Sequence, residues 1–485
     1  MKGQVSRRSL LKGLAIGGAG TVLAACQPKV VEVTSVVEKV VEKVVKETVM
    51  VEGTPQVVEK VVTVQAAPAE RAELRFSTWA DVQDLDVYEK MSLTFMQNQG
   101  DIKVTLEQYP GGYYDKIIAN FAAGASADML YWQGWRWQLY ADEKLLIPLD
   151  TYIARDDAKY AFDEVDGIDL SCKWHGETFM TSVDTGSMVM FYNKDLFDRA
   201  GVEYPQPGWT FDQFKEAIKA TTMVEGDVRY YGYAANPWGG QSGYFDALGW
   251  IRQHGKPEWD EISEPHEARW DQPEIIDAMQ FMINDVTENK WAPEASALQG
   301  GGVTIATGRV AMCPQGPWFL PQMHGEKART EGGINYDVIV CPVGASGRSE
   351  HYFGADGHTI VKTTKSPDAC WEFMKHTVSE QGQQIIAEGG RMPGRVDTIE
   401  KYWVELANTK YNLTNANAFL ETMKSGRFLI TGGKGLDEAA VTGTGTPLRA
   451  AFDAMNGLQK TAKEALEEAN PKTQEIIDAY WSKRG

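Results

Sequence analysis

The chain of 485 residues has few of the residues from which metal centres and disulfide scaffolds are built. Its five cysteines include no C-x-x-C pair and its seven histidines lack metal-ligand spacing, which argues against zinc and thioredoxin-like sites. The G-x-S-x-G, H-E-x-x-H and Walker A motifs are absent. We therefore expect no catalytic residue, metal or cofactor. A disulfide between Cys313 and Cys341 is one alternative, and buried free thiols are the favoured expectation.

Positive charge and long apolar runs are also scarce. The formal net charge is −19, and binding nucleic acid needs a basic stripe to displace counterions, so nucleic acid is excluded as a partner. Beyond the N-terminal segment no run of 18 apolar residues occurs, so no other part is predicted to span a membrane. Tryptophan and tyrosine, at fifteen and nineteen, are abundant, and such a surplus suits flat apolar ligand faces such as those of sugars.

Residues 1–25 have the features of an export signal. A basic segment containing Arg7-Arg8 precedes a short apolar stretch, Leu14 to Ala25, that is too short to span a bilayer. The tetrad Leu23-Ala24-Ala25-Cys26 resembles the lipobox of bacterial lipoproteins, in which cleavage precedes an acylated cysteine. We expect Cys26 to anchor the mature chain to the outer face of the cell membrane. The twin arginine resembles a Tat signal, with Sec export as the alternative.

Residues 26–70 differ in composition from the remainder, because they repeat Val-Val-Glu-Lys and contain no aromatic residue. Residues that repeat every four positions do not stay on one face of a helix, and valine favours strands. The repeat therefore predicts no particular secondary structure. We interpret the segment as a stalk, with a small oligomerising coil as the alternative. The remaining chain exceeds what one hydrophobic core usually supports, which predicts two lobes.

From Arg71 onward, predicted strands and helices alternate, which is typical of an α/β fold with a mostly parallel sheet flanked by helices. The predicted strands include residues 74–79, 102–108, 127–132, 188–192, 310–313 and 336–341. The predicted helices include residues 84–98, 113–123, 211–221 after an N-cap at Thr210, 275–289, 367–377, 380–388 and 447–481.

Four segments in this order resemble the family 1 extracellular solute-binding proteins, the class that includes maltodextrin-binding protein. The segments are Tyr114-Asp115-Lys116-Ile117-Ile118 with Ala127-Asp128-Met129-Leu130; Met188 through Phe197 (MVMFYNKDLF); Gly308-Arg309-Val310-Ala311-Met312 with Gly316-Pro317-Trp318; and Gly354 to Lys365 with Ala369 to Gln381. The resemblance covers residue 72 to the C-terminus. It implies binding rather than catalysis, with an ABC importer permease as partner, and we expect a monomer.

The resemblance also implies a two-lobed fold in which the chain crosses between the lobes three times. It assigns residues 71–185 and 357–394 to lobe 1, and residues 186–356 and 395–485 to lobe 2. The crossings are expected near Asp184 to Ser187, Phe353 to Gly357, and Met392 to Arg395. Gly186, Gly354, Gly357 and Gly394 are expected to absorb the φ/ψ changes of hinge closure.

Ligands of open α/β sheets bind beyond the carboxyl ends of the strands, which selects several tryptophans. Stacking on an indole suits the C–H face of a pyranose. The aromatic candidates, with one neighbouring arginine, are Trp79, Trp132, Trp135, Arg136, Trp238 and Trp318. Trp132 and Trp318 also fall where the family's motifs place sugar-stacking residues. For each tryptophan the alternative is a half-buried core position.

Sugar hydroxyls also need polar partners. The candidates are Asp128 at a strand end, Asp184 and Asp356 at the crossings, and Arg391 before the third crossing. Asp128 has bracing of a loop as its strong alternative, and Arg391 a surface ion pair. Two other functions stay open: the same fold binding a polyol phosphate or other small solute, and a secreted glycoside hydrolase with a hidden carboxylate pair.

Overall fold

The computed structural model describes residues 29–32, 40–51, 54–65, 71–80, 82–163, 165–234, 242–253, 256–299, 302–329, 333–428, 432–439 and 445–484. The predicted signal peptide, Cys26 and Trp238 lie outside the described residues. The chain falls into two compact units, one ending at Leu130 and one beginning at Tyr131, and each is described by itself.

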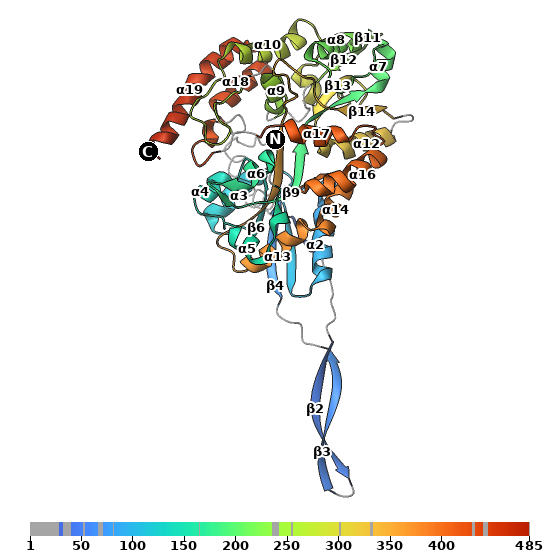
Figure 1. Ribbon diagram of the computed structural model, residues 1–485, viewed down its shortest axis with the longest axis vertical. Helices are drawn as coiled ribbons and strands as arrows, with labels where there is room; N and C mark the ends of the chain where they lie inside the picture. Colours follow the sequence, from blue (N-terminus) through green and yellow to red (C-terminus); the bar gives the residue numbers. More distant parts are fainter. Residues whose placement is uncertain are drawn as a thin grey trace, which may run out of the picture. The chain divides into compact units, whose positions relative to one another are not determined.

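The first unit combines a two-stranded ribbon with a small parallel sheet. Its elements are β1 (Lys29–Glu32), β2 (Val40–Val51), β3 (Thr54–Gln65), β4 (Ala72–Thr78), α2 (Val82–Asn98), β5 (Ile102–Gln108), α3 (Tyr113–Ala123) and the start of β6 (Met129–Gln133). The Val-Val-Glu-Lys repeat, for which no secondary structure was predicted, forms the antiparallel β2–β3 ribbon, which is twisted (Figure 1). β4 runs parallel to both β5 and β6, and β1 pairs antiparallel with β5. Residues 29–32 of the expected stalk therefore lie along a sheet edge.

In the second unit, β15, β9 and β16 pair antiparallel with β9 in the middle. The bounds are β9 (Thr181–Ser187), β15 (Phe353–Ile360) and β16 (Met392–Pro393), with nearby α4 (Gln138–Asp142), α5 (Asp150–Asp156), α6 (Asp166–Cys172), β7 (Lys173–Trp174), β8 (Glu177–Thr178), α13 (Pro367–Thr377) and α14 (Glu380–Glu388). These strands hold the segments predicted as the three crossings.

A second sheet of the same unit has the order β11-β12-β13-β10-β14. Its strands are β10 (Val189–Asn193), β11 (Met223–Glu225), β12 (Val228–Tyr233), β13 (Val310–Gln315) and β14 (Tyr336–Ile339). β12 and β13 are parallel, whereas β10 is antiparallel to both neighbours. The sheets are therefore mixed rather than mostly parallel. Met188 alone separates β9 from β10, so the chain passes between the two sheets there.

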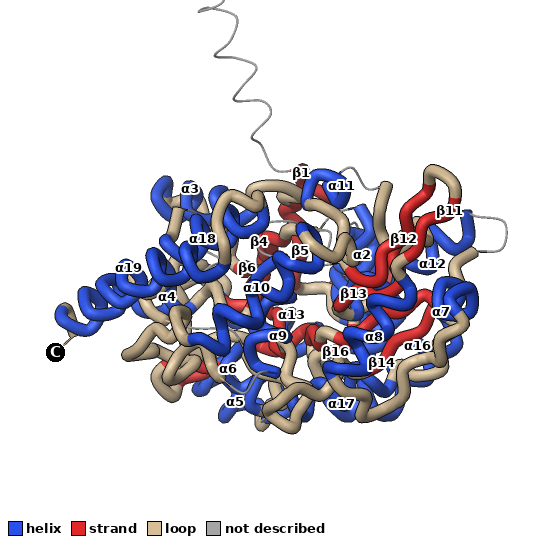
Figure 2. Tube along the Cα trace, turned by 90° about the horizontal axis from the view of Figure 1, so that it is seen from above, coloured by secondary structure: helices blue, strands red, loops and turns tan. Residues whose placement is uncertain are grey.

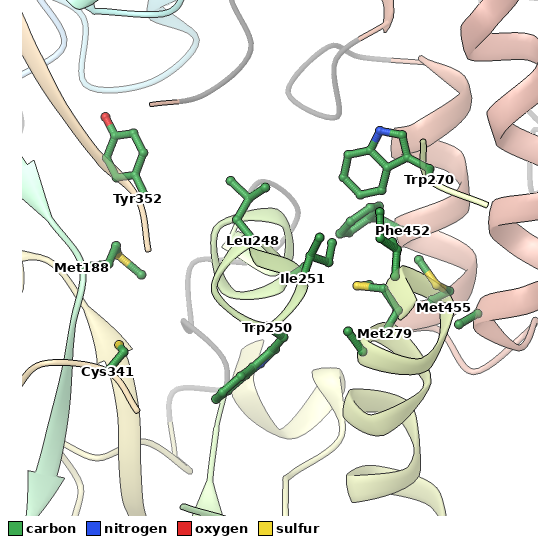
Figure 3. Close-up of a cluster of buried hydrophobic side chains, with 14 of the residues drawn as sticks. Met188, Leu248, Trp250, Ile251, Trp270, Met279, Cys341, Tyr352, Phe452 and Met455 are labelled. Carbon is green, nitrogen blue, oxygen red and sulfur yellow. The ribbon is translucent and has the colours of Figure 1, made fainter. Parts of the chain in front are cut away.

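Helices α7 (Lys194–Ala200), α8 (Phe211–Thr221) and α17 (Asn417–Ser425) contact strands of this second sheet, and the unit has a large apolar core. Its other helices include α9 (Ser242–Gln253), α10 (Pro273–Thr287), α11 (Ala295–Gln299), α12 (Leu320–Arg329), α15 (Val396–Thr398), α16 (Val404–Tyr411), α18 (Pro447–Asn456) and α19 (Ala462–Ser482). α19 contacts both α10 and α18, and the three helices lie close together in Figure 2. Figure 3 shows part of the apolar core of this unit, with side chains from α9, α10 and α18, and Trp270 meets Phe452 edge to face.

Local signals explain several of these boundaries. Thr210 caps α8 with a complete capping box, because its hydroxyl accepts the Gln213 N–H and the Gln213 side chain accepts the Thr210 N–H. Cys172, Cys313, Cys341 and Cys370 are buried free thiols, so the favoured expectation for Cys313 and Cys341 is confirmed. Within the described ranges, no helix has the length and apolar character that crossing a membrane requires.

Candidate ligand-binding site

The three predicted crossings are neighbouring strands, and their register places the candidate residues. In the β9–β15 ladder Gly186 lies opposite Gly354, and Asp184 lies opposite Asp356. Residues directly opposite each other in an antiparallel pair point to the same face, as do residues two apart along one strand. The glycine pair and the aspartate pair therefore share one face of the ladder, with the aspartates about 7 Å further along.

Trp318 lies over the glycine end of this face. It follows β13 through Gly316 and is the second residue of the short 3-10 helix η2 (Pro317–Phe319), where Pro317 occupies the first position. A Cβ atom added at Gly186 would lie 2.7 Å from Cζ3 of Trp318, and one added at Gly316 would lie 2.2 Å from Cη2. The benzo ring therefore occupies the space that side chains at two glycines would need. The indole is half-buried, so part of its surface remains exposed.

The facing glycine, Gly354, carries aromatic groups of its own. A Cβ atom there would lie 2.6 Å from the Phe428 ring and 2.7 Å from the Tyr352 hydroxyl. Trp135 meets the Tyr352 ring edge to face, with centroids 5.6 Å apart, and the Phe428 ring at 6.5 Å. Trp135, Tyr352 and Phe428 are nearly or fully buried and form the support beneath this end of the site.

Asp184 and Arg391 form an ion pair at the aspartate end. Arg391 Nε lies 2.5 Å from Asp184 Oδ2, and the Tyr131 hydroxyl donates to Asp184 Oδ1 at 2.5 Å. The side chains of Asp184 and Arg391 are 5% and 12% exposed, so the pair is largely desolvated. Such a pair survives burial because each charge has partners that replace water. Both carboxylate oxygens of Asp184 are thereby engaged within the protein.

Asp356 differs from Asp184 in its electrostatic surroundings. Burial of the carboxyl group raises the pKa of Asp356 well above its usual value, and the charge of Asp184 adds to this rise. Arg391 and a hydrogen bond from the backbone of Gly134 act in the opposite direction but do not cancel it. The residue itself is half-buried. The pair of aspartates thus holds one engaged carboxylate and one carboxyl group that retains its proton to higher pH.

The glycines of the crossings are closely packed, and their expected role in hinge torsion stays a prediction. None of Gly186, Gly354, Gly357 and Gly394 has a positive φ. An added Cβ would lie 1.8 Å from the Thr181 carbonyl oxygen at Gly357 and 2.1 Å from the Ser182 carbonyl oxygen at Gly394. These positions exclude side chains because neighbouring atoms fill the space.

Trp132 is placed as a core residue and not as a stacking surface. It is fully buried, its indole N–H donates to the Thr359 hydroxyl at 2.8 Å, and its ring lies 4.7 Å from that of Tyr140. The strand-end rule selected the right strand but not the face, because neighbouring residues of β6 point to opposite sides. The prediction that Trp132 is a sugar-stacking residue is therefore corrected.

Two further candidates, Asp128 and Trp79, lie in the first unit. Asp128 Oδ2 accepts the backbone N–H of Arg75 at 2.8 Å, which is the bracing role weighed against ligand binding. Trp79 is half-buried in the first unit, edge to face with Tyr113. Burial raises the pKa of Tyr140 to about 12, and the nearby charge of Arg136 opposes this rise.

Sequence reasoning missed Tyr131, Tyr352 and Phe428. The period of two along β15 could have placed Tyr352 on the face of Gly354 and Asp356. Phe428 is distant in sequence and has no motif, so no local signal identifies it.

The described fold and this site define a two-lobed α/β solute-binding fold with mixed sheets flanked by helices. The family of bacterial extracellular solute-binding proteins matches residues 78–384, and the chain belongs to this family. The predicted two-lobed α/β fold and the family are thereby confirmed, with sheets that are mixed rather than mostly parallel.

Individual relatives are distant. A binding protein of Brucella abortus is 21% identical over 362 residues, covering 70% of this chain and 79% of that protein. The ABC substrate-binding protein of Listeria monocytogenes in complex with cycloalternan has a TM-score of 0.71 at 21% identity, covering 85% and 100% of the two chains. The sugar-binding protein MalE of Xanthomonas citri has a TM-score of 0.69 at 19% identity, covering 85% and 99%.

Proposed function

We propose that this protein binds a carbohydrate outside the cytoplasm and delivers it to the permease of an ABC importer. The observation that carries the proposal is the half-buried Trp318, fixed over two glycines beside Asp184, Asp356 and Arg391. An aromatic face with neighbouring in-plane polar groups matches a sugar, which offers C–H groups on its faces and hydroxyls at its edge. Structural neighbours in complex with cycloalternan and with maltose support the same ligand class.

The charges of the site disfavour a polyol phosphate. Arg391 is paired with Asp184, and Arg395 Nη2 lies 2.7 Å from Asp397 Oδ2. A phosphate would have to compete with these carboxylates for both guanidinium groups. Hydrolysis is disfavoured for a related reason: a glycosidase needs two available carboxyl groups, whereas Tyr131 and Arg391 occupy both oxygens of Asp184.

A sugar panel tests the proposal. The purified protein is incubated with maltose, maltotriose, cyclic α-glucans and sorbitol 6-phosphate, and its melting temperature and the recovered ligands are measured. We expect a rise in melting temperature with at least one sugar, which is recovered intact, because ligand binding stabilises the native state by mass action. Released product would support the hydrolase, and a shift with the phosphate alone would support the other solute class.

Two tryptophan variants test the site itself. Trp318→Ala should weaken sugar affinity by roughly thirtyfold, the cost of truncating a binding hot spot. Trp481 provides the control, because its ring stacks on His266 at 4.0 Å and its indole N–H donates to the Pro265 carbonyl. Trp481→Ala should lower the melting temperature and leave affinity unchanged. Equal affinity losses in both variants would contradict the assignment.

We further propose that the chain is an exported lipoprotein with Cys26 as its acylated first residue. The lipobox-like Leu23-Ala24-Ala25-Cys26 supports this, and the twin arginine supports Tat export. Cys26→Ser should leave an unprocessed precursor. Mass spectrometry of the mature protein should find an acylated Cys26, and a different N-terminus without lipid would contradict the proposal.

The lobe boundaries predicted above, 71–185 with 357–394 and 186–356 with 395–485, belong to the same proposal. We propose that a monomer closes about the β9, β15 and β16 segments when it binds its ligand. Small-angle scattering should give a smaller radius of gyration with saturating sugar than without it.

A further inference from the structure

We propose that Asp356 contacts the ligand as a protonated carboxyl group and donates a hydrogen bond to it, while Asp184 remains the carboxylate held by Arg391 and Tyr131. This inference rests on the proposed carbohydrate function, which it deepens by assigning a hydrogen-bond polarity to one position. It concerns ligands that present a hydroxyl or carbonyl oxygen as an acceptor.

The geometry gives the two aspartates different roles. They are directly opposite each other in the β9–β15 ladder, so their side chains are neighbours on one face. Arg391 Nε and the Tyr131 hydroxyl contact the two oxygens of Asp184, which fixes the negative charge there. A second ionised carboxyl group beside it would meet like-charge repulsion in a poorly solvated place. Asp356 therefore keeps its proton, and its half-buried position leaves the group within reach of a ligand.

The charged and polar groups packed around Asp356 agree with this assignment. Asp184 faces Asp356 from β9. Arg391, which immediately precedes β16, and the N–H of Gly134, in the turn after β6, also face it. His358 on β15 adds no positive charge near neutral pH, because burial lowers its pKa to about 3. The raised pKa of Asp356 follows from burial first and from Asp184 second.

A protonated donor and a carboxylate acceptor predict opposite behaviour. Asparagine keeps a donor of nearly the same shape and cannot ionise. Asp356→Asn should therefore bind the sugar that gives the largest shift in the panel within about threefold of wild type, with no pH dependence from this position. Asp356→Ala should weaken affinity by about tenfold, the size of one buried hydrogen bond. Wild-type affinity should fall as the pH rises, by up to about tenfold per pH unit above the pKa of Asp356.

Infrared spectroscopy provides a readout that does not depend on ligand affinity. The wild-type protein near neutral pH should show the C=O band of a protonated carboxyl group, absent from Asp356→Asn, and sugar should shift this band. Absence of the band, an affinity that rises with pH, or equal losses in Asp356→Asn and Asp356→Ala would each overturn the proposal. The proposal would also be overturned if sugar did not shift the band and if neither the band nor the sugar affinity changed on substitution of Asp356. If no sugar of the panel binds, the carbohydrate function fails, and the band alone still decides whether Asp356 holds a proton.

Discussion

Replacing Gly186 by alanine perturbs the candidate site through a single methyl group. The added Cβ would lie 2.7 Å from Cζ3 of Trp318, whereas carbon atoms in contact prefer separations of about 3.5–4.0 Å. Either the indole or strand β9 must therefore move by about 1 Å. Overpacking of this kind typically costs about 1–3 kcal/mol of folding stability. The same displacement tilts the ring that we propose to stack on the ligand.

Urea denaturation and calorimetric titration with the panel sugar measure the two consequences. Gly186→Ala should lower the free energy of unfolding by about 1–3 kcal/mol and weaken sugar affinity by about tenfold, equivalent to 1.4 kcal/mol. Gly325→Ala is the matched control, because Gly325 lies on α12 shortly after Trp318 and an added Cβ there meets no atom within 4 Å. In a helix interior this change should be neutral or stabilise by about 0.5–1 kcal/mol.

A double-mutant cycle tests the cause. In a Trp318→Ala background the ring is gone, so Gly186→Ala should lose most of its cost in stability. If Gly186→Ala is equally destabilising with and without the indole, the clash with Trp318 is not its cause. If Gly186→Ala also leaves sugar affinity at the wild-type value, the role of the glycines in positioning Trp318 is refuted.

Four further changes separate stability from binding. The pKa of Asp356 is raised in the folded state, so its contribution to stability is present below the unfolded pKa and is lost as pH rises through the folded pKa. Asparagine does not titrate, so the melting temperature of Asp356→Asn relative to wild type should increase with pH. Arg391→Met strands a buried carboxylate and should cost about 3–5 kcal/mol in urea denaturation, whereas Arg449→Met on an exposed pair should cost under about 1 kcal/mol. Trp132→Ala should cost about 3–5 kcal/mol as a core truncation, measured by the same assay without ligand. Thr210→Ala removes the α8 cap and should cost about 1 kcal/mol with unchanged sugar affinity by calorimetry.

Elements governed by local patterns could be predicted from the sequence. Thr210 and the helical spacing after it predicted Phe211–Thr221, which is α8 as observed. The range 380–388 likewise matches α14, and 102–108 matches β5. In these segments capping chemistry and apolar periodicity agree with the tertiary packing, so local information was sufficient.

The orientation of strand residues could not be predicted in the same way. β6 is buried on both faces, so its sequence has no alternation that would tell which of Tyr131 and Trp132 points where. Its partners are also remote, since Thr359 lies 227 residues from Trp132. The register of the β9–β15 ladder is a similar case, because a slip of one residue would move Asp356 to the opposite face from Asp184.

The glycines at the crossings illustrate how one residue type can carry two signals. Their number near the expected hinge suggested torsional freedom, which stays a prediction, and the structure adds close contacts with rings and carbonyl oxygens. These explanations differ in what they permit. A torsional role would tolerate a change in neighbouring side chains, but a contact role ties each glycine to the atom that fills its space. Gly186 and Trp318 therefore form a contact pair, and their substitutions should be combined.

The contact between Gly186 and Trp318 connects the proposed ligand recognition to the crossing strands. Trp318 belongs to the chain that follows β13, yet its ring lies on β9, which continues within one residue into β10 of the other sheet. Asp184 is two residues before Gly186 on the same strand and face, so stacking and hydrogen bonding are positioned by one ladder rather than by separate loops. A ligand that contacts both ends of this face would therefore bear directly on the strands where the chain passes between the two sheets. We therefore expect ligand binding to be coupled to the proposed closure through the backbone of β9.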